Sequence, residues 1–205
     1  MTPILLIIIA LVAYSLGGVN GAIISSRYIF HDDVRNHGSG NAGLTNFNRT
    51  YGVKGIVLVL AIDIIKTVLA VLFGGLLMKS AGAPEVGRVF GGFCAILGHV
   101  APIYYGFKGG KGVLCAGTMI LIVDPVAGIC CWAVFILVAI CTRYISLSSC
   151  IACLMGPVFA AIFGVSGLEV LLVLFCALLV VFKHAENILR IFNGSESRFT
   201  FNKSR

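Results

Sequence analysis

Long apolar runs with almost no charged side chains limit the folds open to this chain. They cover residues 3–24, 55–78, 89–107, 113–141 and 150–182. A bilayer crossing needs about 20 apolar residues, wound into a helix that satisfies its own backbone. Because 59% of the 205 residues are hydrophobic and only 11% are charged, the chain is predicted to be an all-α, polytopic membrane protein with a single domain, residues 1–205.

The number of crossings depends on whether the two longest runs contain turns. Asp124-Pro125 predicts a turn within 113–141, because the residue before proline avoids the helical region. Residues 164–167 (GVSG) predict another turn within 150–182, and Glu169 then lies near the surface. Splitting both runs gives about seven transmembrane helices, and splitting neither gives five. Seven is preferred because it collects all the polar motifs on one side.

The distribution of Lys and Arg predicts the orientation. Twelve of them fall in 25–54, 108–111, 142–148 and 183–205, and two, Lys79 and Arg88, fall on the other side. Since cytoplasmic loops carry the excess of positive charge, the N-terminus is predicted outside and the C-terminus in the cytoplasm. Topology also explains the net charge of +7 without a nucleic-acid partner, although anionic substrates or lipid headgroups are a compatible second cause.

The eight cysteines do not indicate a metal site or a disulfide framework. Most lie in or at the ends of apolar runs, where cysteine behaves as a small hydrophobic residue. Cys150 and Cys153 have CxxC spacing, but no second pair or histidine accompanies them. A lone CxxC is weak evidence for metal or redox chemistry, so no metal and no cofactor are expected.

The most polar segment, HGSGNAGLTNFNR at 37–49, is interpreted as an anion site. Glycine leaves backbone N–H groups accessible, and such groups attract anions. Arg49 offers two parallel donors suited to phosphate. The alternative is an interfacial loop that satisfies its own backbone. The candidate residues are Gly38, Ser39, Gly40, Asn41, Gly43, Thr45, Asn46 and Arg49.

A second glycine-rich segment, FKGGKG at 107–112, follows the third apolar run. It is not a Walker A loop, because Val113 stands where that pattern requires Ser or Thr. A lysine among glycines at a helix start still favours anions, since free N–H groups and the helix dipole face the ligand. The candidate residues are His99, Gly109, Gly110, Lys111 and Gly112.

Two further polar segments lie on the same predicted side. Arg143 with Ser146 is either a helix cap and membrane anchor or part of the site. The segment HAENILR brings His184, Asn187 and Arg190 roughly to one helical face, and the alternative is an amphipathic tail lying on the membrane.

Asp63 and Lys66 lie three residues apart within a crossing. Charges in lipid are costly and are usually paired or functional. The two side chains either neutralise each other as structural support or contact a substrate.

Three segments resemble the signatures of the bacterial acyl-phosphate:glycerol-3-phosphate acyltransferase (PlsY) family, which are GSGNxGATNxxR, GHxFPxxxxFxGGKG and HxxNIxRxxxGxE. This sequence has GSGNAGLTNFNR at 38–49, GHVAPIYYGFKGGKG at 98–112 and HAENILRIFNGSE at 184–196. RYIS at 143–146 is similar to the family's RxxS, and DIIK at 63–66 to its DxxK. The resemblance extends from about residue 33 to residue 196.

The sequence departs from the family pattern at four places. Leu44 replaces the usual Ala, Ala101 replaces the Phe before proline, and Cys115 replaces a Thr. The family's Gly-Ser-x-Pro is altered in the segment GGVN that ends at Asn20. These departures bear on acyl-chain preference and efficiency.

The resemblance implies transfer of an acyl group from acyl phosphate to the 1-hydroxyl of glycerol 3-phosphate, giving lysophosphatidate and phosphate for phospholipid synthesis. It implies a bacterial plasma-membrane enzyme whose site faces the cytoplasm. Membrane lipid and the enzyme that supplies acyl phosphate are then the expected partners. A small transporter of phosphorylated anions is one alternative, against which no inverted repeat is visible. A non-catalytic protein that binds lipid headgroups is another.

Within this reading, Lys111, Arg49 and the glycine N–H groups hold two phosphates. Direct attack on an activated acyl phosphate needs no covalent enzyme intermediate, and donors aimed at the oxyanion stabilise the transition state. Ser39, Asn41 and Thr45 are candidate oxyanion donors. The base is open between His184, which is otherwise a phosphate-orienting residue with Asn187, and a substrate phosphate. The catalytic candidates are Ser39, Asn41, Arg49, Lys111, Ser146, His184 and Asn187; the supporting candidates are Asp63, Lys66, His99, Arg143, Arg190 and Glu196.

Overall fold

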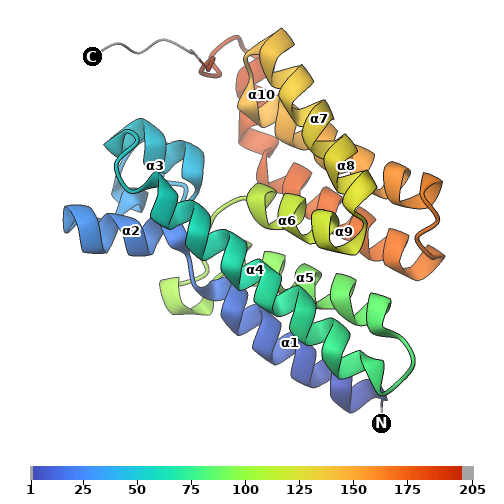
Figure 1. Cartoon of the computed structure of the whole chain (residues 1–205). Helices are drawn as coiled ribbons and strands as arrows, with labels where there is room; N and C mark the ends of the chain where they lie inside the picture. Colours follow the sequence, from blue (N-terminus) through green and yellow to red (C-terminus); the bar gives the residue numbers. More distant parts are fainter. Residues whose placement is uncertain (1, 200–205) are drawn as a thin grey trace.

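The structure is a computed structural model that describes residues 2–199. These residues form ten α-helices and two short 3-10 helices (Figure 1). The elements in chain order are α1 (Thr2–Gly18), α2 (Gly21–Phe30), η1 (Val34–Asn36), α3 (Leu44–Tyr51), α4 (Ile56–Lys79), α5 (Pro84–Val100), η2 (Ile103–Tyr105), α6 (Val113–Val123), α7 (Pro125–Thr142), α8 (Ile145–Ile162), α9 (Gly167–Lys183) and α10 (Ala185–Phe192).

The lengths of the apolar helices confirm an all-helical membrane protein. Five segments are long and apolar enough to cross a bilayer: Thr2–Phe30, Ile56–Ala81, Pro84–Tyr105, Pro125–Thr142 and Ile145–Ile162. A sixth is obtained if α9 and α10, which meet at a 54° bend, form one crossing. Helix α6 is apolar but has only 11 residues, which is short for a crossing of ordinary thickness.

Both turns predicted within the longest apolar runs are present. Helix α6 ends at Val123 and α7 begins at Pro125, where the missing N–H of proline costs no helical hydrogen bond. The Asp124 carboxylate accepts a hydrogen bond from the backbone N–H of Ala127 at 2.9 Å and so caps α7. The turn at 164–167 separates α8 from α9. Glu169 departs from expectation, because only 5% of it is exposed in the first turn of α9.

The first apolar run is broken, contrary to the single segment expected at 3–24. Helix α1 ends at Gly18 and α2 begins at Gly21. Asn20 between them has an extended backbone, and its side-chain oxygen accepts a hydrogen bond from the N–H of Ile23. A polar residue that caps a helix from an extended conformation starts a new helix rather than continuing the old one.

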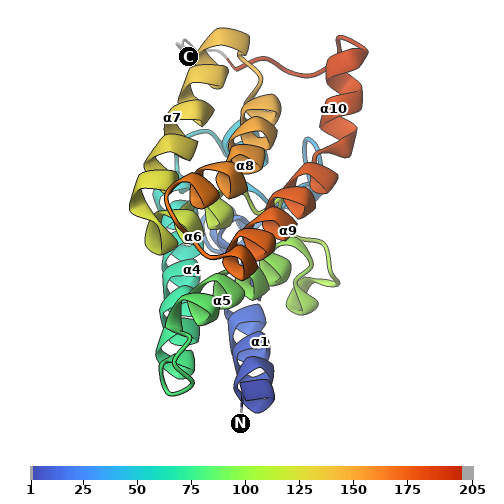
Figure 2. The same cartoon turned by 90° about the vertical axis from the view of Figure 1, so that its right-hand side faces the viewer.

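The helices pack in two groups. Helices α1, α4 and α5 lie side by side, and α6–α9 form a second group that contacts the first through α4, α5, α6 and α9 (Figures 1 and 2). Gly74 of α4 and Gly87 of α5 face each other so closely that a Cβ on either would overlap the other's carbonyl oxygen. Small residues of this kind let helices in membranes approach closely.

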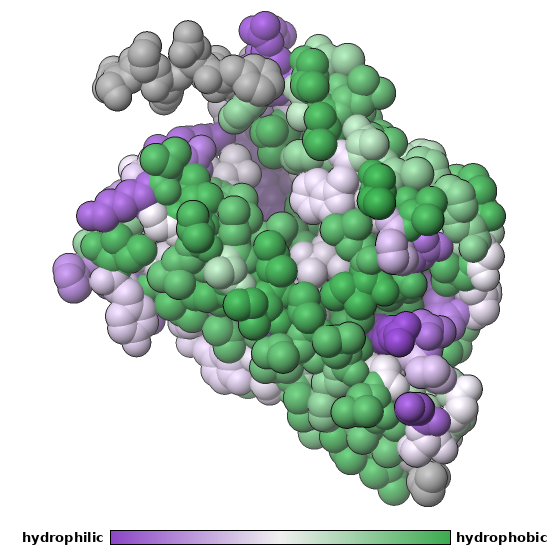
Figure 3. All heavy atoms as spheres, viewed as in Figure 1, coloured by the Kyte–Doolittle hydropathy of each residue, from purple (hydrophilic) through white to green (hydrophobic). Residues whose placement is uncertain are grey.

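Hydrophobic and hydrophilic residues are separated on the surface. Figure 3 shows hydrophobic residues over most of the broad face, with hydrophilic residues around α2 and α3 and in a recess beside them. Lys79 and Arg88, the two cations predicted for the opposite side, flank the α4–α5 turn. Two of the twelve cations assigned to the polar side, Lys203 and Arg205, lie outside the described residues.

Candidate active site

A buried asparagine, Asn46, holds the backbone of the first glycine-rich loop through hydrogen bonds. Asn46, 3% exposed, accepts a hydrogen bond from the Ser39 N–H at 3.0 Å. Its amide donates to the carbonyls of Val34 at 3.1 Å and His37 at 3.0 Å. Both amide hydrogens are therefore used within the protein, so Asn46 holds the loop in this structure rather than presenting donors to a ligand. Gly38 allows this packing, because its φ is 57° and a Cβ would overlap the Asn46 oxygen.

The other candidate side chains of this loop are accessible. Ser39 and Thr45 are exposed, and Asn41 is half-buried beside Gly43. Gly43 caps the start of α3 without a side-chain hydrogen bond. The first-turn N–H groups of a helix have no partner within the helix and favour an anion, and Ser39, Asn41 and Thr45 surround this end.

The second glycine-rich loop packs against His99 at the end of α5. The Gly110 N–H donates to the His99 carbonyl at 3.0 Å. A Cβ on Gly109 would overlap that carbonyl, and one on Gly110 would overlap the His99 ring. The glycines therefore permit close packing in addition to the backbone access expected for them. Gly112, with φ of 82°, turns the chain into α6.

The two glycine-rich loops contact each other directly. The Ala42 N–H donates to the Gly109 carbonyl at 3.3 Å. Nearby, the Arg35 guanidinium donates to the Tyr105 carbonyl at 2.9 Å. Segments more than 60 residues apart in sequence thus form one surface.

Lys111 joins the second loop to the C-terminal part of the chain. Its ammonium donates to the side-chain oxygen of Asn187 in α10. Burial lowers the pKa of Lys111 to about 8, against the opposing effect of Glu196. A half-buried lysine that remains largely charged near neutral pH is suited to a phosphate ligand.

Glu196 is the centre of a hydrogen-bond cluster beside Lys111. One carboxylate oxygen accepts from Ser146 at 2.8 Å and from Asn187 at 2.7 Å. The other accepts from Arg190 at 2.9 Å. Burial raises the pKa of Glu196, but these three donors outweigh it and the net pKa is lowered. The carboxylate therefore orients Asn187 and Ser146 as a charged acceptor.

The end of the described chain crosses over to two other candidate segments. Arg49 donates to the Ser197 hydroxyl at 2.6 Å, a contact that no motif in the sequence indicated. Arg143 ends α7 with a φ of 61°, and its carbonyl accepts from the Phe199 N–H at 2.7 Å. Arg143 thus contributes a carbonyl to the assembly, while its side chain is exposed.

His184 lies at the bend between α9 and α10 and is 4% exposed. Its Nδ1 is 2.8 Å from the Val180 carbonyl oxygen. Because a carbonyl only accepts, Nδ1 carries the proton. A neutral ring then presents Nε2 as a proton acceptor.

Asp63, Lys66 and His99 form a buried network beneath the two loops. The Lys66 ammonium lies 2.7 Å from the Asp63 carboxylate, 2.9 Å from His99 Nδ1 and 2.7 Å from the Val19 carbonyl. These three acceptors match the three hydrogens of the ammonium. Asp63 also accepts from the Gly21 N–H at 3.2 Å.

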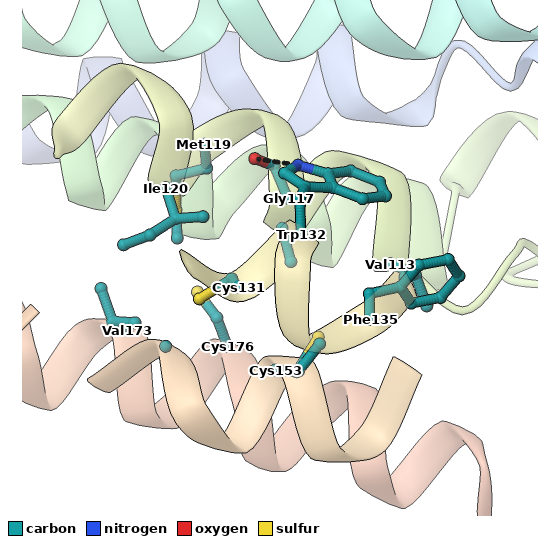
Figure 4. Close-up of a pocket in the computed structure, with 13 residues that line it drawn as sticks. Val113, Gly117, Met119, Ile120, Cys131, Trp132, Phe135, Cys153, Val173 and Cys176 are labelled. Atoms are coloured by element: carbon teal, nitrogen blue, oxygen red, sulfur yellow. Dashed lines mark hydrogen bonds between the residues drawn. The ribbon is translucent and has the colours of Figure 1, made fainter. Parts of the chain in front are cut away.

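An apolar cavity lies between α6, α7, α8 and α9, directly after Lys111 along the chain. Figure 4 shows Val113 and Phe135 at one end of it, and Ile120 and Val173 at the other. Val113 is the first residue of α6, so the cavity begins beside the cationic loop. Its lining suits a hydrocarbon chain and offers little to a polar ligand.

Fold and site together define a helical membrane protein with a cationic, glycine-lined site at one end of its bundle, next to an apolar cavity. Among residues 2–199, no three His, Cys, Asp or Glu side chains are grouped as they would be around a metal ion. A site of this composition suits a ligand that carries both a phosphate and an apolar group.

Comparison with known proteins identifies the family. The family model for glycerol-3-phosphate acyltransferase matches residues 7–194. Glycerol-3-phosphate acyltransferases from Thermoanaerobacter sp. (strain X514) and Clostridioides difficile (strain 630) are 36% and 37% identical, over 94% of this chain and 94% of each relative. The chain therefore belongs to the glycerol-3-phosphate acyltransferase family.

Solved structures agree in fold as well as sequence. The crystal structure of PlsY (YgiH), an integral membrane glycerol 3-phosphate acyltransferase, in its glycerol 3-phosphate form has a TM-score of 0.84 and 32% identity, covering 95% of this chain and 96% of that one. The lysophosphatidic acid form of PlsY has a TM-score of 0.83 and 30% sequence identity, with 95% of each chain covered.

Proposed function

We propose that this chain transfers an acyl group from an acyl phosphate to the 1-hydroxyl of glycerol 3-phosphate. The hydroxyl oxygen bonds to the acyl carbon, the bond from that carbon to the phosphate oxygen breaks, and inorganic phosphate leaves. Lysophosphatidate is the other product. The observation that carries this proposal is the convergence of Lys111, Arg49 and both glycine-rich loops next to an apolar cavity.

Both substrates carry phosphate, which accounts for the density of cationic and N–H donors. Lys111 and Arg49 hold the phosphates, with N–H groups at the start of α3 and α6. Ser39, Asn41 and Thr45, which belong to the first loop, aim donors at the developing oxyanion. The acyl chain lies in the cavity that begins at Val113, so its carbonyl is held at the cationic end.

The proton of the attacking hydroxyl needs an acceptor. His184 presents Nε2 for this role, and the substrate phosphate is the alternative. If His184 is the base, His184→Ala lowers kcat by about 10²- to 10⁴-fold, the usual contribution of a general base. A kcat within about threefold of the parent with a raised KM assigns His184 to phosphate orientation instead. Ser149→Ala, a buried change on α8 that removes only a hydrogen bond within that helix, is the matched control.

The charge distribution supports an orientation for the protein. We place the polar end of the bundle in the cytoplasm of a bacterial cell, because it carries ten of the twelve described Lys and Arg residues other than Lys66, and Lys79 and Arg88 lie at the other end. The seven-crossing arrangement counts the short α6 as one crossing, with the N-terminus outside. A single domain, residues 1–205, then holds both substrate sites and draws acyl phosphate from the enzyme that makes it.

One assay tests the function against its alternatives. Purified protein in detergent is incubated with palmitoyl phosphate and glycerol 3-phosphate, with palmitoyl thioesters of coenzyme A and acyl carrier protein as parallel donors. We expect lysophosphatidate and phosphate in equal amounts when palmitoyl phosphate is the donor, and no product from either thioester. Turnover from the thioesters instead overturns the donor assignment. Absence of product, with glycerol 3-phosphate uptake into proteoliposomes, favours a transporter, and binding without turnover or uptake favours a lipid-headgroup-binding protein.

The pKa of Lys111 predicts how activity depends on pH. The charged ammonium of Lys111 holds phosphate, and burial lowers the pKa of Lys111 to about 8. As pH rises from 7 to 9, the charged fraction of Lys111 falls about tenfold, and kcat/KM for glycerol 3-phosphate falls with it. Lys111→Arg keeps the charge at both pH values, so its profile is flat over this range. An equally steep decline in Lys111→Arg contradicts the assignment.

A further inference from the structure

Asn20 is a fully buried polar residue at the break between α1 and α2, and it lies outside every motif that suggested the site. Its side-chain oxygen accepts from the Ile23 N–H at 2.9 Å. Its side-chain nitrogen donates to the Ala42 carbonyl at 3.0 Å. The first contact starts α2, whereas the second reaches across to the first glycine-rich loop.

Ala42 is the point at which the two glycine-rich loops touch. It is fully buried, and its N–H donates to the Gly109 carbonyl at 3.3 Å. A Cβ on Gly110 would lie 2.9 Å from the Ala42 carbonyl oxygen. The carbonyl of Ala42 is thus bound by Asn20, and its N–H is bound by Gly109 of the second loop.

The break that carries Asn20 is itself fixed to α4. The Val19 carbonyl accepts from Lys66 at 2.7 Å, and the Gly21 N–H donates to Asp63 at 3.2 Å. Asn20 therefore extends from a backbone that is held on both sides by buried charged groups. The hydrogen bond from its amide therefore holds Ala42 at a fixed place relative to α4.

We propose that Asn20 is a positioning residue that sets the spacing of the two anion-binding loops, and through it the affinity for the phosphate groups of the substrates. The inference rests on the proposed function for the identity of those substrates. Removing the Asn20 donor leaves the Ala42 carbonyl buried without its partner. The first loop is then no longer held at a fixed position relative to the second.

The experiment compares two substitutions that differ in what they remove. Asn20→Ser keeps a hydroxyl that caps α2 but is too short to reach Ala42. Ser25→Ala is the matched control, because Ser25 is fully buried in the same helix and its hydroxyl has no hydrogen-bond partner among the described residues. Asn20→Thr, whose hydroxyl also caps α2 but does not reach Ala42, is the second variant if Asn20→Ser does not fold. Each purified protein is assayed for KM and kcat with both substrates.

We expect Asn20→Ser to raise the KM for glycerol 3-phosphate or for palmitoyl phosphate about tenfold, the effect of one misplaced hydrogen bond, with kcat within about threefold. Ser25→Ala stays within twofold of the parent in both constants. A KM within twofold for both substrates overturns the proposal. A lower kcat with both KM values unchanged also overturns it, because a loss of folded protein has that signature.

A second readout separates this proposal from the proposed function. Glycerol 3-phosphate and inorganic phosphate are each titrated while thermal unfolding is followed in detergent, which reports binding without turnover. If the parent makes no lysophosphatidate, the function fails, and a right-shifted titration for Asn20→Ser but not Ser25→Ala still supports the positioning role. Coincident titrations for the parent and Asn20→Ser overturn it.

Discussion

Lys111→Ala is expected to lower kcat/KM at least about 10³-fold. The substitution removes a full positive charge from a partly buried site, and the loss of even one neutral donor at a developing anion costs about 10²- to 10³-fold. It also leaves the Asn187 oxygen without its ammonium donor. Initial rates of phosphate release at saturating palmitoyl phosphate, measured across glycerol 3-phosphate concentrations, provide the test.

Lys108→Ala is the matched control for this result. Lys108 is exposed and lies three residues earlier in the same loop, so its loss changes the net charge equally without removing a ligand of the site. Its kcat/KM is expected within about threefold of the parent. Comparable losses in both variants show that general charge, rather than the position of Lys111, governs the reaction.

Asp63→Ala is expected to lower the stability of the folded protein by about 3–5 kcal/mol, because it leaves a buried ammonium without its carboxylate. Lys66 is 4% exposed and lies within a crossing, where water does not compensate the charge. The backbone at Gly21 also loses its acceptor. Thermal unfolding in detergent, scanned at a fixed rate, measures the change.

A double variant tests whether the pair acts as a unit. If Asp63→Ala and Lys66→Met each leave one unpaired charge, the combined variant loses clearly less stability than the sum of the two losses. Ile65→Ala, at an exposed position of the same helix, is the control and changes stability little. Strict additivity of the two losses shows that Asp63 and Lys66 are not coupled.

The helices followed from the apolar runs because a bilayer leaves the backbone few alternatives. Pro125 and the glycines at 164–167 marked the turns through their own backbone preferences. The break at Asn20 was missed, since one polar residue hardly changes the hydropathy of a run. An asparagine directly before Gly21 in an otherwise apolar segment was the available signal, because its amide must find partners there.

The residues of the site were easier to predict than their roles. Crossings that alternate direction bring polar segments to one end, so the meeting of Lys111 with Asn187 follows from topology. The burial of Asn46 under its own loop does not follow from topology, because an amide can bind a ligand or the backbone equally well. Ser197, the partner of Arg49, lies beyond the last motif, and nothing in its surroundings distinguishes it from other serines.

The position of Glu196 has a consequence for how the protein is made. Ser146, Asn187 and Arg190 all donate to this one carboxylate, which follows all ten described helices along the chain. Every described helix is therefore synthesised before this carboxylate. A chain stalled in the membrane before residue 196 lacks the acceptor that orders Ser146, Asn187 and Arg190 beside Lys111.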